Sequence, residues 1–205
     1  MDFKTKIKLG GITNLADARY AAAAGIDYIG FCFDTNSTNY IAPIKAKEII
    51  DWINGCEIVA EFGDQTIDEI KTISELLKVD LVEINNKILP TDLTSFDNHL
   101  IKKINVDDFD LESLKNEIDA YKNIVKMFHL YSSENKQIFE ANMIDELCIQ
   151  NNIIWGFTLN TENIISTLNT YHPYAINVFG GTEEKTGYKD FDELNELLDL
   201  ISNEI

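Results

Sequence analysis

The sequence has little positive charge and no run of basic residues. Its 205 residues include 17 Lys and Arg against 35 Asp and Glu, which gives a net charge of −18 at pH 7. A surface this acidic repels nucleic-acid phosphates and anionic lipids. We therefore expect no nucleic-acid partner and no role at a membrane surface.

Cysteine pairs and long apolar runs are also missing. Cys32, Cys56 and Cys148 are far apart, no Cys-x-x-Cys pair exists, and no His stands near any of them. This pattern predicts free thiols in a reducing compartment. No apolar run approaches the roughly 18 residues that cross a membrane, and the first residues carry no apolar signal-peptide core. We therefore expect a cytoplasmic protein with no membrane span, no metal and no cofactor.

Short apolar runs alternate with amphipathic stretches along the chain, and the latter carry apolar residues at three- and four-residue spacing. The expected strands span residues 7–10, 28–33, 58–62, 81–85, 100–106, 125–131, 153–159 and 175–179. The expected helices span residues 16–24, 43–53, 66–77, 91–96, 111–121, 136–149, 161–171 and 190–201. Eight such units that begin with a strand predict an α/β protein, a (β/α)8 TIM barrel in a single domain over residues 1–205. An open doubly wound sheet is disfavoured, because the first strand-to-helix turn has no Gly-x-Gly-x-x-Gly pattern.

Both ends of the chain resemble one enzyme family. Residues 8–13, Lys-Leu-Gly-Gly-Ile-Thr, are similar to the Lys-Ile-Cys-Gly-Ile-Thr of phosphoribosylanthranilate isomerases. Residues 187–190, Gly-Tyr-Lys-Asp, are similar to that family's Gly-Val-Lys-Asp. The resemblance covers nearly the whole chain and is weakest in the middle. It implies a barrel related to enzymes of tryptophan biosynthesis, which catalyse an Amadori rearrangement of an aminoribose phosphate.

The resemblance also implies site positions that this chain fills differently. The family's general base is a Cys where this chain has Gly10, and its general acid is an Asp where this chain has Tyr131. A glycine can move no proton, and a phenol with a pKa near 10 is a poor acid at neutral pH. Asn39 replaces the Arg taken to hold the anthranilate end, and it cannot form a bidentate carboxylate clamp. Asn177 replaces the Asp that contacts the ribose.

The family's phosphate site is altered on one side and retained on the other. Its two glycines after the seventh strand become Phe157 and Thr158, and Phe157 can fill the space that a phosphate would use. After the eighth strand, Gly180 and Gly181 remain, followed by Thr182. They can form an anion-binding nest or an ordinary turn into the last helix.

Strand alternation predicts which polar side chains enter the barrel. Lys8, Glu83 and Asn85 should point inward. A buried Glu83 needs a partner, and Lys8 is the natural one, either as a structural ion pair or around a carboxylate prepared for acid–base work. His129 lies two residues before Tyr131 on the same face. It is either a catalytic group or a buried His bonded to a neighbour.

These observations predict a divergent member of the family that lacks its base and acid. Losing one acid–base group costs roughly 10²–10⁴-fold in rate. We expect the parent isomerisation to be absent or altered, and the pocket to bind a small phosphorylated-sugar-like molecule in a monomer or homodimer. The alternatives are a working isomerase with an unusual site and a purely structural or partner-binding barrel.

The candidate residues follow from the same comparison. Cys32 is expected inside a strand, where a buried thiol is inert. The candidate catalytic residues are Glu83, His129 and Tyr131. The candidate substrate-binding residues are Asn39, Asn85, Thr158, Asn177, Gly180 and Gly181.

Overall fold

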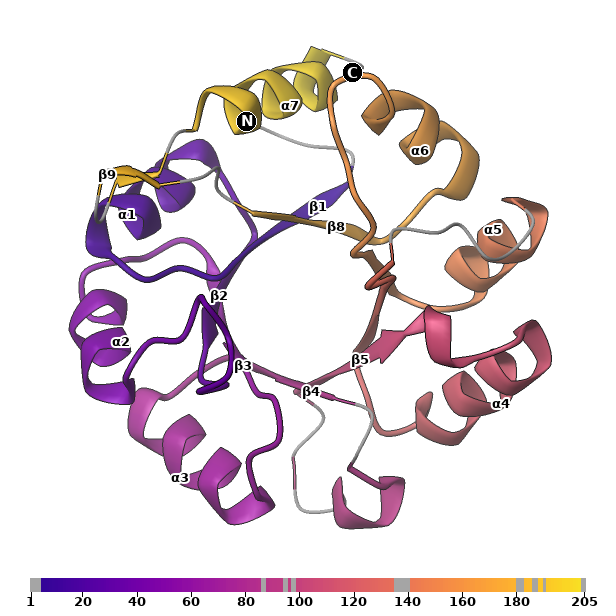
Figure 1. The fold of residues 1–205 in the computed structure, drawn as a ribbon, viewed down its shortest axis with the longest axis horizontal. Helices are drawn as coiled ribbons and strands as arrows, with labels where there is room; N and C mark the ends of the chain where they lie inside the picture. Colours follow the sequence, from indigo (N-terminus) through magenta and orange to yellow (C-terminus); the bar gives the residue numbers. More distant parts are fainter. Residues whose placement is uncertain are drawn as a thin grey trace.

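Eight parallel strands close into a barrel in sequence order, with the helices outside it (Figure 1). The computed structural model describes residues 5–85, 88–93, 96, 99–134, 141–179, 183–185, 188–189 and 191–203. The barrel strands are β1 Lys6–Gly10, β2 Tyr28–Cys32, β3 Glu57–Glu61, β4 Leu81–Ile84, β5 Leu100–Asn105, β6 Met127–Tyr131, β7 Ile153–Trp155 and β8 Ala175–Phe179. The predicted (β/α)8 barrel is confirmed.

Seven α-helices lie outside the barrel in the part of the chain described. They are α1 Leu15–Ala24, α2 Pro43–Ile50, α3 Ile67–Leu77, α4 Leu111–Tyr121, α5 Ala141–Gln150, α6 Ile164–Tyr171 and α7 Asp192–Asn203, with short 3-10 helices η1 Pro90–Leu93 and η2 Val106–Asp108. None of the helices described is long and apolar enough to cross a membrane. The start of the expected helix 136–149 lies outside the described residues, as does residue 190.

The α-helix predicted at 91–96 is not formed over residues 91–93, and residues 94–95 lie outside the described residues. Its place is taken by η1, a single 3-10 turn. Leu93 is fully buried, whereas Leu89 one turn earlier is 60% exposed. A longer helix needs a continuous apolar face, because packing of that face supplies most of a helix's stability.

Two strand boundaries differ from the prediction by more than one residue. The segment predicted as strand 153–159 leaves the barrel after Trp155, because the residues that follow form a loop closed by Asn160 and Asn163. Residue 125 ends a turn after α4 instead of starting a strand, since the amide of Val125 donates to the carbonyl of Tyr121 at 3.0 Å. A short hairpin, β9 Glu183–Lys185 with β10 Tyr188–Lys189, was not predicted and lies beside α1 (Figure 1).

The inside of the barrel is apolar at the amino-terminal end of the strands. One inward residue from each of β2 to β8 forms this layer: Tyr28, Val59, Leu81, Ile101, Met127, Ile154 and Ala175. Two residues further along the chain from each of these positions, the inward-facing residues are polar, charged or glycine. This second layer is the floor of the candidate site.

Candidate functional site

The second layer of the barrel interior is a ring built from one residue of each of seven strands and the residue that directly follows β7. Alternation places these residues two positions beyond the apolar layer. They are Lys8, Gly30, Glu61, Glu83, Lys103, His129, Gly156 and Asn177. We call them the inner ring.

Lys8 is the hub of the inner ring and is only 1% exposed. Its Nζ lies 3.2 Å from Glu83 Oε2, so the predicted ion pair is confirmed. It also forms an ion pair with Glu61 and donates a hydrogen bond to Asn177 Oδ1 at 3.1 Å. Burial opposes the charge of Lys8, but the two carboxylates outweigh it and raise the Lys8 pKa.

The carboxylate of Glu83 contacts the side chains of three cationic or polar neighbours. Besides Lys8, it lies 3.5 Å from Lys103 Nζ through Oε1 and 2.9 Å from His129 Nδ1 through Oε2. Burial alone would raise the pKa of Glu83, but Lys8, His129 and Lys103 together hold that pKa well below its usual range. Glu83 is therefore a carboxylate at neutral pH.

His129 is neutral and oriented by Glu83. Burial lowers the pKa of His129, and the nearby carboxylate offsets this only in part. Because Nδ1 faces a carboxylate, we assign the ring proton to Nδ1, which leaves a lone pair on Nε2. A Cβ on Gly156 would lie well under 3.0 Å from that Nε2, so this ring position requires glycine on the neighbouring strand.

Tyr131 completes the group of candidate catalytic residues. Its ring centroid lies 6.3 Å from that of His129, and Lys103 Nζ lies 5.1 Å from the tyrosine ring. Burial raises the pKa of Tyr131 despite the nearby lysine. The phenol is therefore a weaker acid here than in water. The structure brings together all three residues that the sequence proposed for catalysis.

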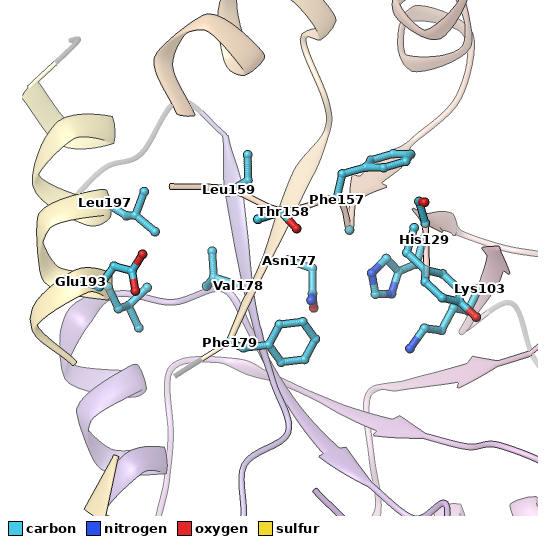
Figure 2. Close-up of a pocket in the computed structure, with 14 residues that line it drawn as sticks. Lys103, His129, Phe157, Thr158, Leu159, Asn177, Val178, Phe179, Glu193 and Leu197 are labelled. Atoms are coloured by element: carbon cyan, nitrogen blue, oxygen red, sulfur yellow. The ribbon is translucent and has the colours of Figure 1, made fainter. Parts of the chain in front are cut away.

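A cavity of about 370 Å³ opens above the inner ring at the carboxyl ends of β5 to β8 (Figure 2). Its polar lining comes from Lys103, His129, Tyr131, Ser132, Thr158 and Asn177 and, from α7, the carboxylate of Glu193. Its apolar lining includes Phe157, Leu159, Val178, Phe179, Leu194 and Leu197, the last two from α7. Figure 2 shows Lys103 and Asn177 with their polar ends toward the space between Phe179 and His129.

The position of the family's base is crowded. A Cβ on Gly10 would lie 3.2 Å from Glu61 Oε1, 3.2 Å from Phe179 Cε1 and 3.4 Å from Asn177 Oδ1. Glu61 also passes over Gly30, where a Cβ would lie well under 3.0 Å from the carboxylate. Glu61 and Phe179 therefore occupy the space into which a side chain at position 10 would project.

Sequence reasoning missed Glu61 and Lys103. Both could have been found by extending to β3 and β5 the alternation applied to β1 and β4, since Glu61 pairs in register with Glu83 and Glu83 with Ile101. Lys103 then shares the inward face two residues after Ile101.

Two predicted substrate-binding residues lie outside the cavity. Asn85 donates to the carbonyl of Gly63 and, at 3.2 Å, to Asp64, and it lines a separate depression on the β3 and β4 side. The Asn39 side chain packs over Gly11, which has a φ of 69°. Gly180 and Gly181 lie outside the described residues. Thr158 and Asn177 do line the cavity.

Cys32 belongs to strand β2 as expected, but it is the last residue of the strand instead of an internal one. The amide of Ile41 donates to the Cys32 carbonyl at 2.9 Å. Burial raises the pKa of the Cys32 thiol, so the reactive thiolate is disfavoured at neutral pH. Cys56 and Cys148 are also free thiols whose pKa burial raises.

The loop after β7 keeps Phe157 at the side of the cavity. Its ring packs on Trp155 with centroids 4.7 Å apart, and Figure 2 shows it directed away from Asn177. The following turn is closed by two amides: Asn160 Oδ1 accepts from the Asn163 amide at 3.0 Å, and Asn163 Oδ1 accepts from the Asn160 amide at 2.8 Å. Among the described residues, no group of three or more His, Cys, Asp or Glu could hold a metal ion.

The fold and the cavity define a (β/α)8 barrel with its pocket at the carboxyl ends of the strands, where enzymes of this fold carry their active sites. Residues 7–199 match the family model described as N-(5'-phosphoribosyl)anthranilate (PRA) isomerase. The chain therefore belongs to this family, and the resemblance seen in the sequence is confirmed.

Curated relatives and solved structures agree with this family. The chain is 25% identical over 198 residues to the N-(5'-phosphoribosyl)anthranilate isomerase of Pelobacter propionicus, covering 94% of this chain and 93% of that one. It is 28% identical over 199 residues to that of Citrifermentans bemidjiense, covering 95% of each. The structure of the isomerase from Thermotoga maritima matches with a TM-score of 0.83 and 21% identity, over 97% of this chain and 99% of that one. An isomerase bound to reduced 1-(o-carboxyphenylamino)-1-deoxyribulose 5-phosphate matches with a TM-score of 0.82 and 22% identity, with the same coverage.

Proposed function

We propose that this chain is a divergent family member that binds a small phosphorylated-sugar-like molecule in its cavity and does not catalyse the family's Amadori isomerisation beyond a trace. The observation that carries the proposal is the end of β1. Gly10 offers no proton acceptor, and a Cβ there would lie 3.2 Å from both Glu61 Oε1 and Phe179 Cε1. A longer side chain at this position would require both neighbours to shift.

The acid side of the reaction supports the same conclusion. The family's acid is a carboxylic acid, whereas Tyr131 is a phenol whose pKa burial raises further. The one cation lining the described part of the cavity is Lys103, and Asn39 packs over Gly11 away from it. Positions 10 and 131 thus lack the thiol and the carboxylic acid that the family uses for proton transfer.

Binding itself is supported by the shape of the site. A cavity of about 370 Å³ is within the range of small-molecule sites. Most of its polar groups gather at the base and on one side, while Phe179, Leu194 and Leu197 form a mainly apolar wall that also carries Glu193. A molecule with several hydroxyls and one charged group would match this division.

The test is a direct assay with phosphoribosylanthranilate, beside growth rescue of an isomerase-deficient cell that requires tryptophan. The isomerase of Pelobacter propionicus is the positive control in both. We expect no rescue, and no product above the uncatalysed background. Rescue together with robust turnover by the unmodified chain would overturn the proposal.

A working isomerase with an unusual site is the second candidate. The contact of 2.9 Å between His129 Nδ1 and Glu83 Oε2 favours it, because a carboxylate that orients a neutral imidazole is an arrangement that enzymes use for proton transfer. The names of the curated relatives support it equally. In that case His129→Asn, which keeps a hydrogen bond to Glu83, should abolish the turnover seen in the assay above.

A further inference from the structure

We propose that the floor of the cavity is an oxyanion site, in which Lys103 Nζ and Asn177 Nδ2 bind a carboxylate or phosphate group of the ligand. The inference rests on the proposed binding function of the same cavity. It adds the chemical class of the ligand group that contacts the floor of the cavity. It also assigns the binding of that group to strands β5 and β8 rather than to the loops after β7 and β8.

Asn177 is fixed as a hydrogen-bond donor toward the cavity. Its side chain is 4% exposed, and its Oδ1 accepts from Lys8 Nζ at 3.1 Å. Because a lysine can only donate, this bond sets the orientation of the amide. Nδ2 has no acceptor among the described residues. A buried donor without an acceptor is unfavourable, and an oxygen of a ligand would supply the missing acceptor.

Lys103 supplies the charge. It is the only Lys or Arg lining the cavity among the residues described, and a third of its side chain is exposed. Its contact with Glu83 is long, at 3.5 Å, and Glu83 is shared with Lys8 and His129. Lys103 can therefore turn toward a ligand without leaving Glu83 unpaired. Figure 2 shows its amine and the amide of Asn177 facing the same space.

The replacement at position 177 has a chemical consequence. A carboxylate at this position, as the family resemblance implies, would repel an oxyanion and accept from a hydroxyl. The amide in this chain reverses that preference, because Lys8 occupies its only acceptor. The inner ring holds two lysines and two glutamates, so it is close to neutral before the ligand arrives. Glu193 adds a carboxylate to the α7 side of the cavity, beside Leu197 and across from Lys103 in Figure 2. A negative charge of the ligand is therefore accommodated at the opposite side, where the Asn177 donor and the Lys103 cation converge.

The experiment measures ligand affinity by calorimetry with four probes: ribose 5-phosphate, ribonate, inorganic phosphate and uncharged ribose. Lys103→Met removes the charge, Lys103→Arg retains it, and Asn177→Asp turns the donor into a carboxylate. Lys126→Gln is the matched control, because Lys126 pairs with Glu57 away from the cavity lining. Thermal unfolding of each variant checks that it is folded.

We expect an anionic probe to bind about tenfold or more tightly than ribose, and Lys103→Met and Asn177→Asp each to lose at least about tenfold. Lys103→Arg and Lys126→Gln should stay close to the unmodified protein. The sugar phosphate and the sugar acid then tell the two sources of the oxyanion apart. If Lys103→Met fails to fold, Asn177→Asp and Lys103→Arg still decide the question.

The outcomes separate this inference from the proposed function. Tight binding of ribose 5-phosphate that neither variant weakens would overturn the oxyanion site and leave the proposed function intact. Binding of ribonate that depends on Lys103, without binding of ribose 5-phosphate, would support the site and overturn the phosphorylated ligand. No binding of any probe at about 10 mM, ten times a weak Kd of about 1 mM, would overturn both.

Discussion

Two glycines on the inward faces of the strands make room for the charged floor of the cavity. Gly30 lies under the carboxylate of Glu61, and Gly156 lies against the ring of His129. Any side chain at either position would collide with these groups. The requirement for glycine is one of space, since neither residue has a positive φ. The polar floor therefore depends on residues that carry no chemistry themselves.

Gly30→Ala should destabilise the protein by about 1–3 kcal/mol, the usual cost of overpacking a tight interior. The added methyl would lie well under 3.0 Å from Glu61, whose ion pair with Lys8 resists displacement. Gly10→Ala is the matched control, because its nearest contacts are at 3.2 Å and should cost less. Urea unfolding of both variants checks the order. Equal stability of the two would mean that Glu61 moves aside freely.

Glu83 is the residue on which the buried charges depend. Glu83→Gln removes the shared partner of Lys8, Lys103 and His129, and we expect a loss of about 3–5 kcal/mol at pH 7, typical of a broken buried pair. Its lowered pKa contributes stability that is present above the unfolded pKa of about 4.3 and is lost as the pH falls through the folded value. The difference between the two proteins should therefore shrink below about pH 4.

The measurement is urea unfolding at several pH values, with Glu48→Gln as control. Glu48 pairs with Lys45 on the exposed face of α2, where an ion pair is worth about 0–1 kcal/mol. A gap between Glu83→Gln and the unmodified protein that stayed constant down to acid pH would show that the pKa of Glu83 is not lowered in the folded state.

At the scale of elements, the loop after β7 sets the side of the cavity. Asn163 holds it with two bonds, accepting from the Asn160 amide and donating from Nδ2 to the Thr158 carbonyl at 3.0 Å. Asn163→Ala should cost about 1–2 kcal/mol and weaken ligand binding, because Thr158 lines the cavity. Asn163→Asp keeps the acceptor and should recover part of both. Calorimetry with the sugar probes and thermal unfolding provide the readouts; unchanged affinity in Asn163→Ala would contradict the positioning role of this loop.

Most barrel elements could be predicted because a single period governs each. Short apolar runs identified the strands. The alternation of side chains along a strand predicted the Lys8–Glu83 pair, since both residues face inward. The ends of elements were less predictable. The last turn before β6 and the early end of β7 depend on local hydrogen bonds that leave no periodic signal.

The candidate site could be predicted only in part. Glu83, His129 and Tyr131 were found because strand position alone brings them together. Asn39 and Asn85 were assigned by resemblance, and the structure turns both toward loop backbone instead of the cavity. The crowding at Gly10 was not foreseen, because it arises from Glu61 on a strand that is not its neighbour.

At the scale of the whole molecule, the charges inside the barrel are largely paired, whereas those of the whole chain are not balanced. The interior pairs its charges almost completely, whereas the chain as a whole carries −18. Unpaired surface charge of one sign destabilises the compact state by self-repulsion. It also disfavours the approach of any anion, so binding of an oxyanion has to rely on the local field of Lys103 at short range.

The stability of the protein should therefore rise with salt. Between about 10 mM and 0.1 M NaCl the screening length falls from about 30 Å to about 10 Å, which weakens repulsion across the acidic surface. Salt also weakens surface ion pairs such as Lys47–Asp51 and Lys115–Glu146, but each exposed pair contributes only about 0–1 kcal/mol. The buried pairs of Lys8 are shielded from it. The effect on repulsion should be the larger one, and we expect Tm to rise by a few degrees in thermal unfolding at pH 7.

This rise in Tm with salt should vanish near the isoelectric point, where the net charge is zero. A fall in Tm with salt at pH 7 would mean that the surface ion pairs outweigh the repulsion among the excess acidic residues.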